Sequence, residues 1–179
     1  FVLLCGKPLI IHSLDTLSRC RQLESLIVVA HPQHVERMRS LIKMHGCQKV
    51  KTVVAGGETR RKSVERGMDA LDDDTRIVAI HDGARPLVSV EDVDKVVDEV
   101  REYPAAILAV RVKPTIKQVD DETMLVVATL NRRQLWDVQT PQVFQRKVLE
   151  QAHQKCHCEN PTDDAAMVEK SGAAVKVVE

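Results

Sequence analysis

Short runs of aliphatic and β-branched residues alternate along this chain with longer segments of helical periodicity. Runs such as Leu26–Val29 are apolar throughout, as in strands that are buried on both faces of a parallel sheet. Strands are expected over residues 25–30, 50–55, 76–80, 105–112, 124–130 and 174–178. Helices are expected over residues 8–20, 32–45, 60–71, 90–102, 144–156 and 162–171. The alternation predicts an α/β fold, with a mostly parallel sheet and helices on both of its faces.

One stretch, residues 111–133, interrupts this alternation. It holds two strand-like pieces on either side of a polar turn, residues 118–123, with no helical segment between them. Such a stretch favours a β-arm that projects from the sheet. A length of 179 residues suits one globular domain, so we expect a single domain over residues 1–179 with 111–133 as its appendage.

Two helices have clear end signals. Ser89 can cap the helix that follows it, and Asp92 favours the positive end of that helix. Thr162, which follows Pro161, is expected to open another helix, and Gly172 is expected to close it.

Charge and composition exclude several classes of partner. Lys and Arg number 26 and Asp and Glu number 26, so the chain lacks the positive excess of a general nucleic-acid binder or membrane-surface protein. With one Trp, one Tyr and two Phe it has almost no platform for stacking bases. No apolar run approaches the roughly 20 residues of a membrane span. Five cysteines, an odd number, favour a reducing compartment.

The loop over residues 55–63 leads from an expected strand into an expected helix. Its paired glycines, Gly56 and Gly57, allow a ligand to approach the backbone closely, and the helix start offers unpaired N–H groups to an anion. The alternative is an ordinary turn followed by a solvated basic face, residues 60–62. The loop matches neither a Walker motif nor a dinucleotide fingerprint.

A second loop, His81–Pro86, directly follows the strand expected at 76–80. Ligands of open α/β sheets gather at the carboxyl ends of strands. Asp82 could hold Mg²⁺ over phosphates there, and Arg85 could bind a phosphate with two hydrogen bonds. In the alternative interpretation Asp82 caps a helix and Arg85 only pairs with it.

These loops belong to a set of short motifs that runs through the whole chain. The set comprises Gly6-Lys7-Pro8, Gly56-Gly57 with Arg60 and Ser63-Val64, His81–Pro86, Thr115 with Lys117, Arg132 through Leu135-Trp136, Thr140-Pro141-Gln142 with Phe144, and Thr162-Asp163-Asp164-Ala165. In order and spacing the set resembles the 2-C-methyl-D-erythritol 4-phosphate cytidylyltransferase family of the non-mevalonate isoprenoid pathway. The resemblance implies a Rossmann-like nucleotidyltransferase domain. It also implies Mg²⁺-assisted, in-line attack of a sugar-alcohol phosphate on the α-phosphorus of CTP, which gives a CDP-alcohol and pyrophosphate.

The resemblance also implies a role for individual residues. Asp82 is the metal ligand, for Mg²⁺ or another divalent cation, and Asp82 and Arg85 are the catalytic residues. The implied nucleotide-binding residues are Gly57, Glu58, Ser63, Asp82 and Gly83. The implied substrate-binding residues are Arg85, Thr115, Arg132 and Thr140. The family often has Asp at position 58 and Ala at position 83.

Two further expectations follow from the resemblance. The arm enters a neighbouring subunit, which implies a homodimer. A glycine-rich loop with one catalytic lysine belongs before Phe1, and a second lysine belongs after Glu179, so the 179 residues are expected to be a fragment that is inactive on its own. The expected location is the bacterial cytoplasm, or a plastid in a eukaryote.

Two alternatives remain open. The closest is an enzyme of the same fold that acts on a pentitol phosphate such as ribitol 5-phosphate, although Gly83 and Ala84 favour the methylerythritol enzyme. The second is a nucleotide-binding module without catalytic activity.

A cluster of His153, Cys156, His157 and Cys158 suggests a zinc site, but its spacing fits no common structural-zinc pattern. The spacing favours a helix end that runs into a loop.

The neighbour of Asp82, His81, is the obvious candidate for a general base. A phosphate monoester is already ionised near neutral pH, so a base would have little to remove. His81 is therefore expected to pack behind the loop as a structural residue.

Overall fold

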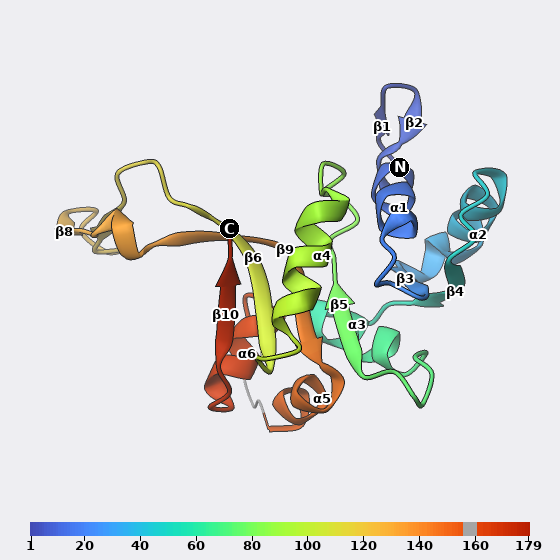
Figure 1. Ribbon diagram of the computed structural model, residues 1–179. Coiled ribbons are helices and arrows are strands. Elements are labelled where there is room, and N and C mark those ends of the chain that lie inside the picture. Colours follow the sequence, from blue (N-terminus) through green and yellow to red (C-terminus); the bar gives the residue numbers. More distant parts are fainter. Residues whose placement is uncertain (156–160) are drawn as a thin grey trace.

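The central sheet of the computed structural model has four strands in the order β10-β6-β9-β5 (Figure 1). The structure describes residues 1–155 and 161–179. The strands are β5 (Ile77–Ile80), β6 (Ala105–Arg111), β9 (Trp136–Gln145) and β10 (Val175–Val178). β10 pairs with β6 in parallel, whereas β9 runs antiparallel to both β6 and β5. The expected α/β architecture is confirmed, with β9 making the sheet mixed.

Helices cover both faces of this sheet. α4 (Val90–Glu99) packs on one face, and α5 (Arg146–Lys155) and α6 (Asp164–Lys170) pack on the other (Figure 1). Neighbouring strand residues alternate between the two cores, as the pleat requires. Val143 belongs to the core with α4, and Phe144 belongs to the core with α5 and α6.

A second, two-stranded sheet lies beside the first. Its parallel strands are β3 (Leu26–Ala30) and β4 (Val50–Ala55), and α1 (Leu9–Arg19), a short 3₁₀ turn (Pro32–His34) and α2 (Val35–Met44) complete this region. Helix α1 joins the two parts. Leu17 packs in the core with α4, while Ile11 and Leu14 pack in the core with β3 and β4.

The remaining elements lie at the periphery. β1 (Leu3–Leu4) and β2 (Lys7–Pro8) form a small hairpin before α1, and α3 (Arg60–Met68) follows β4. The expected arm is present as an antiparallel hairpin of β7 (Lys117–Val119) and β8 (Val126–Thr129), followed by a 3₁₀ turn (Arg132–Gln134). Figure 1 shows this arm extending away from the sheet and its helices.

Most expected elements agree with the structure to within a few residues, but β9 was not anticipated. Ser89 caps α4 as expected, since its Oγ accepts a hydrogen bond from Asp92 N at 3.0 Å. The cap of α6 is Asp163 rather than Thr162, because the Asp163 carboxylate reaches Ala166 N at 2.8 Å. In the described part of the chain, no helix has both the length and the apolar character needed to cross a bilayer.

Candidate functional site

The loop His81–Pro86 leaves the carboxyl end of β5 and is held by a chain of hydrogen bonds. Thr140, on the neighbouring strand β9, lies at the centre of this chain and is 6% exposed. Its Oγ1 accepts a hydrogen bond from Asp82 N at 3.2 Å and lies 2.9 Å from His81 Nδ1. His81 Nε2 lies 3.1 Å from the carbonyl oxygen of Arg85, at the other end of the loop. We call this arrangement of His81, Asp82, Arg85 and Thr140 the latch.

The partners of the His81 ring assign its tautomer. A carbonyl oxygen can only accept, so Nε2 carries the hydrogen and donates to Arg85. Nδ1 then accepts the hydroxyl hydrogen of Thr140, whose lone pair is left for Asp82 N–H. Burial lowers the pKa of His81, which favours this neutral form. The imidazole therefore packs behind the loop.

Helix α1 supports the same loop from a second side. Ser13 is 1% exposed and donates its hydroxyl hydrogen to the carbonyl oxygen of Gly83 at 3.2 Å. A Cβ atom on Gly83 would lie 2.3 Å from Cδ1 of Ile10. Glycine at position 83 therefore lets the loop lie directly on α1.

The carboxylate of Asp82 points to the open side of this loop, and its side chain is 44% exposed. Arg85 Nε contacts Asp82 Oδ2 at 3.1 Å, and Arg85 Nη1 is hydrogen-bonded to Gln139 of β9. The alternative interpretation of this loop included an ion pair between Asp82 and Arg85, and that ion pair is present. It also places a carboxylate and a guanidinium side by side, where one could bind a cation and the other a phosphate.

The loop over residues 55–63 leaves β4 and is closed by Ser63. Ser63 Oγ accepts a hydrogen bond from Gly57 N at 3.2 Å and lies 3.0 Å from the carbonyl oxygen of Thr59. Thr59 caps α3 by accepting from Lys62 N at 3.1 Å. A Cβ atom on Gly57 would lie 2.3 Å from Cβ of Lys62, so only glycine fits there. Gly57 and Glu58 are exposed at the start of α3.

The predicted substrate residues of the arm lie apart from these loops. Thr115 and Arg132 are exposed, and Arg132 Nη1 donates to the carbonyl oxygen of Lys113 at 2.8 Å, within the arm itself. The arm extends away from β5 and α4 (Figure 1). One chain therefore brings together Asp82, Arg85 and Thr140, but not Thr115 or Arg132.

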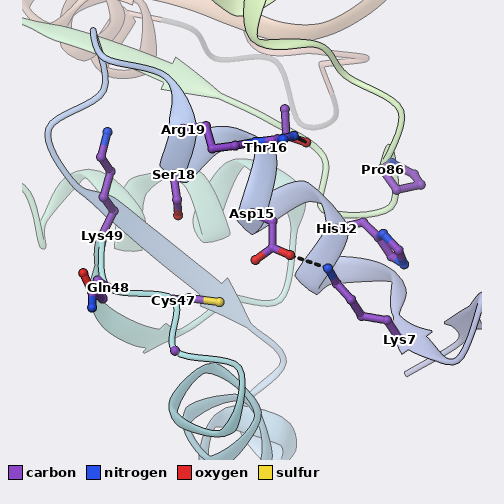
Figure 2. Close-up of a pocket in the computed structure, with 11 residues that line it drawn as sticks. Lys7, His12, Asp15, Thr16, Ser18, Arg19, Cys47, Gln48, Lys49 and Pro86 are labelled. Carbon is purple, nitrogen blue, oxygen red and sulfur yellow. Dashed lines mark hydrogen bonds and ion pairs between the residues drawn. The ribbon is translucent and has the colours of Figure 1, made fainter.

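An open cavity lies beside α1, outside the set of predicted residues. Figure 2 shows it between α1 and the segment 46–49, with Pro86 at one end. Several of its charged groups have partners within the chain. Lys7 is paired with Asp15, and Lys49 Nζ donates to the carbonyl oxygens of Cys20 and Leu23 at 2.6 and 2.7 Å.

The described residues contain no group of three or more His, Cys, Asp or Glu side chains that could hold a metal ion. Three members of the His/Cys cluster that suggested a zinc site, Cys156, His157 and Cys158, lie outside the described residues. Mg²⁺ is commonly bound by one or two carboxylates together with phosphates and water, so the single carboxylate of Asp82 suits it when a nucleotide is bound.

Sequence reasoning missed two supporting contacts made from β9. Gln139 contacts Arg85, and Gln142, 2% exposed, donates to Asp163 at 2.8 Å and accepts from Ala165 N at 3.2 Å, at the start of α6. A strand prediction over residues 136–145 would have placed Gln139 next to the loop.

Comparison with known proteins gives consistent matches over the whole chain. The family model described as 2-C-methyl-D-erythritol 4-phosphate cytidylyltransferase matches residues 1–179. A relative with that name from Halalkalibacterium halodurans is 41% identical over 100% of this chain and 78% of its own. One from Streptomyces coelicolor is 44% identical over 97% of this chain and 67% of its own. A crystal structure titled 4-diphosphocytidyl-2C-methyl-D-erythritol synthase, from Anaerococcus prevotii, has a TM-score of 0.91 at 30% identity, over 99% of this chain and 79% of that one.

Proposed function

The chain belongs to the 2-C-methyl-D-erythritol 4-phosphate cytidylyltransferase family, and from that premise we propose how its residues divide the work of the reaction. The enzyme is a nucleotidyltransferase that joins CTP and 2-C-methyl-D-erythritol 4-phosphate. In such a transfer a substrate phosphate oxygen bonds to the α-phosphorus of CTP as the bond to pyrophosphate breaks. The protein has to bring two anions together and stabilise the added charge.

The loop after β5 is the proposed centre of the chemistry. The observation that carries this proposal is the latch, which aims the exposed carboxylate of Asp82 outward beside Arg85. Asp82 would hold Mg²⁺, which would neutralise charge on the triphosphate. The guanidinium of Arg85 would bind the phosphate of the sugar alcohol and hold it near the α-phosphorus. Gly83 would let the nucleotide approach the backbone.

The loop before α3 is the proposed cytidine site. Gly57 and Glu58 would offer backbone groups to the base, and Ser63 fixes the loop through Gly57 N. The structure gives the Ser63 hydroxyl this supporting role in addition to the direct contact with the nucleotide that the resemblance implies. Thr140, for which the resemblance implies substrate binding, also has a supporting role, because its buried hydroxyl is hydrogen-bonded within the latch.

We also propose a homodimer in which the arm completes the partner's site. Thr115 and Arg132 are remote from Asp82 within one chain but suit a second phosphate contact. The arm exposes a band of apolar side chains that a partner could cover: Val119, Met124, Leu125, Val126, Val127 and Leu130. We further propose that the enzyme acts in a bacterial cytoplasm, which the bacterial sources of its relatives support.

Replacing Asp82 by Asn in the full-length enzyme tests the assigned centre. Asn keeps the shape of the side chain but binds Mg²⁺ weakly, so turnover should fall by about a hundredfold or more with little change in Tm. Asp73→Asn, on the exposed loop before β5, is the matched control and should leave turnover unchanged. A near-normal Mg²⁺-dependent rate in Asp82→Asn would contradict the role of Asp82.

The pentitol phosphate alternative has its own test. Initial rates with 2-C-methyl-D-erythritol 4-phosphate and with ribitol 5-phosphate, measured on the same preparation, should favour the first substrate strongly. Equal or reversed kcat/KM values would contradict this assignment.

A further inference from the structure

Helix α3 follows the proposed cytidine loop directly, yet none of its residues is buried. An amphipathic helix is normally held by an apolar face, and α3 has little of one. Its position must therefore depend more on polar contacts than the positions of α1 or α4 do. This matters because the first turn of α3 carries Ser63, which closes the loop onto Gly57.

One of these contacts is an ion pair with a carboxylate in the interior. Asp164, the first residue of α6, is fully buried at 0% exposure. Its Oδ2 lies 2.6 Å from Nη2 of Arg60, the first residue of α3. Its Oδ1 lies 3.4 Å from Nε2 of His153 on α5, which is 4% exposed.

The other side of His153 leads back to α3. His153 Nδ1 lies 3.6 Å from Oε1 of Glu65, and Glu65 pairs with Arg61 at 3.1 Å. Arg61 also donates to the carbonyl oxygen of His153 at 2.5 Å. These residues, Arg60, Arg61, Glu65, His153 and Asp164, form what we call the α3 ionic cluster. It ties the exposed helix to α5 and α6, which cover the face of the sheet opposite α4.

We propose that Asp164 is a positioning residue for CTP: through Arg60 it holds the start of α3 in the orientation that the cytidine loop requires. This proposal rests on the proposed function of that loop. A buried carboxylate is stabilised only while its charged partner stays in place. The ion pair with Asp164 therefore fixes the position of the Arg60 side chain. A displacement of about 1 Å in a binding loop can weaken function by a large factor.

The alternative is that Arg60 binds a phosphate of CTP directly, and the pair then only adds stability. A double-mutant cycle separates the two cases. If Asp164 acts through Arg60, then Arg60→Met, Asp164→Asn and the double variant weaken CTP binding by similar factors. If Arg60 contacts the nucleotide, Arg60→Met weakens binding more than Asp164→Asn, and the two effects multiply.

The test measures steady-state kinetics on the full-length enzyme together with amide hydrogen exchange in the absence of nucleotide. In Asp164→Asn we expect the KM for CTP to rise roughly tenfold, with kcat and the KM for the sugar phosphate within about twofold of wild type. Exchange at residues 57–63 should speed up in the same variant. Arg60→Lys, which keeps the charge, should recover part of the CTP affinity that Arg60→Met loses.

Asp163→Asn is the matched control. Asp163 caps α6 through Ala166 N and accepts from Gln142 of β9, and neither of these partners belongs to α3. This variant should change Tm without changing the KM for CTP. The proposal is overturned if Asp164→Asn behaves like Asp163→Asn, with exchange at 57–63 unchanged. The Arg60→Met/Asp164→Asn variant removes both charges and so keeps the test available if an unpaired charge prevents folding.

Failure of the proposed function would look different. A wild-type enzyme that does not bind CTP would contradict the cytidine site, whereas the exchange rates at 57–63 would still report whether Asp164 holds α3.

Discussion

The loop after β5 and the arm between β6 and β9 both carry predicted site residues, but they are held in opposite ways. Within one chain, the loop is fixed by the buried hydroxyl of Thr140 and by Ser13 of α1. The arm holds Arg132 by a contact within itself and leaves its apolar side chains exposed, with Val127 at 62%. This difference supports the proposal that each chain builds the Asp82 side of a site and that the arm of a partner completes it.

The largest change in activity is expected when two variants, one defective in the loop and one in the arm, are mixed. Asp82→Asn and Arg132→Ala should each lose about a hundredfold or more in kcat/KM at low sugar-phosphate concentration. If arms are exchanged, a mixed dimer has one site with both residues intact. Random reassociation of equal amounts should therefore restore about a quarter of wild-type activity.

The same mixture gives a clear negative result. Recovery of no more than the sum of the two variants would mean that the arm serves the site of its own chain or none. Arg132→Ala alone should raise the KM for the sugar phosphate and leave CTP affinity unchanged, and a loss of CTP affinity would contradict the placement of the arm.

Removing the hydroxyl at the centre of the latch is expected to have the next largest effect. Thr140→Val keeps the shape of the side chain but takes away the acceptor for Asp82 N and the donor for His81. We expect kcat to fall about 10- to 100-fold, measured at saturation with both substrates. Thr140→Ser keeps the hydroxyl and should stay close to wild type. A variant Thr140→Val with normal kcat and a raised KM for the sugar phosphate would mean that Thr140 is a direct ligand.

The contact between the loop and α1 should produce a smaller change. Gly83→Ala introduces a methyl group against Cδ1 of Ile10, at 2.3 Å in the present arrangement. Because that atom is the end of a side chain, we expect a cost of about 1 kcal/mol in stability and a few-fold rise in the KM for CTP. Ile10→Val removes Cδ1 and should restore the stability and the KM for CTP of the Gly83→Ala variant. If neither recovers, the effect of Gly83→Ala comes from the backbone conformation at position 83 and not from the contact with Ile10.

The smallest effect expected is a difference in how the stability of α3 and that of the arm respond to acid. Although burial works to raise it, the charges of Lys62 and Arg61 hold the pKa of Glu65 below its usual value. Hydrogen bonds from Thr123 lower the pKa of Asp120 at the tip of the arm. A carboxylate with a lowered pKa stabilises the folded state above its unfolded pKa of about 4, and this contribution is lost as the pH falls through the folded value.

Chemical denaturation of Glu65→Gln and Asp120→Asn across pH tests this difference. The deficit of Glu65→Gln relative to wild type should be full at neutral pH and shrink below about pH 4. Asp120→Asn should leave the global midpoint unchanged, since the exposed tip can open locally. An equal shift of the denaturation midpoint in both variants would mean that the arm unfolds together with the rest of the chain.

Much of the fold follows from the sequence, because short runs rich in β-branched residues, bounded by helical segments, mark most of the strands. β4 lies at its expected bounds, and β3, β5 and β10 begin within one residue of theirs. The two candidate loops were found for the same reason, since each directly follows such a run. The arm was recognisable from the absence of a helix between two strand-like pieces.

The central strand β9 was missed because its sequence breaks the rules for a central strand. Polar residues alternate through its first half, and Pro141 cannot donate to a ladder. The pairing explains how proline is accommodated. Between Ile107 and Ala109 of β6 the register jumps from Gln142 to Val138 of β9, so Pro141 lies in an irregular stretch between paired residues.

The supporting contacts of the site could not be predicted from spacing. The latch joins His81 to Thr140, which is 59 residues later, and the α3 ionic cluster joins Arg60 to Asp164 across three helices. Local patterns point to candidate ligands at strand ends. They do not identify which distant side chain satisfies the buried hydrogen bonds of a loop.

The position of α1 between two sheets has a consequence for how the molecule unfolds. In the described part of the chain no strand of the β3–β4 pair is hydrogen-bonded to the four-stranded sheet. Leu14 and Leu17, one turn apart on α1, lie in different cores, and Ser13, next to Leu14, contacts the loop after β5. Helix α1 therefore couples the two halves, together with the contacts of α3 with α5 and α6. A substitution in its core-facing residues should separate one unfolding transition into two and release the loop His81–Pro86 in the first of them.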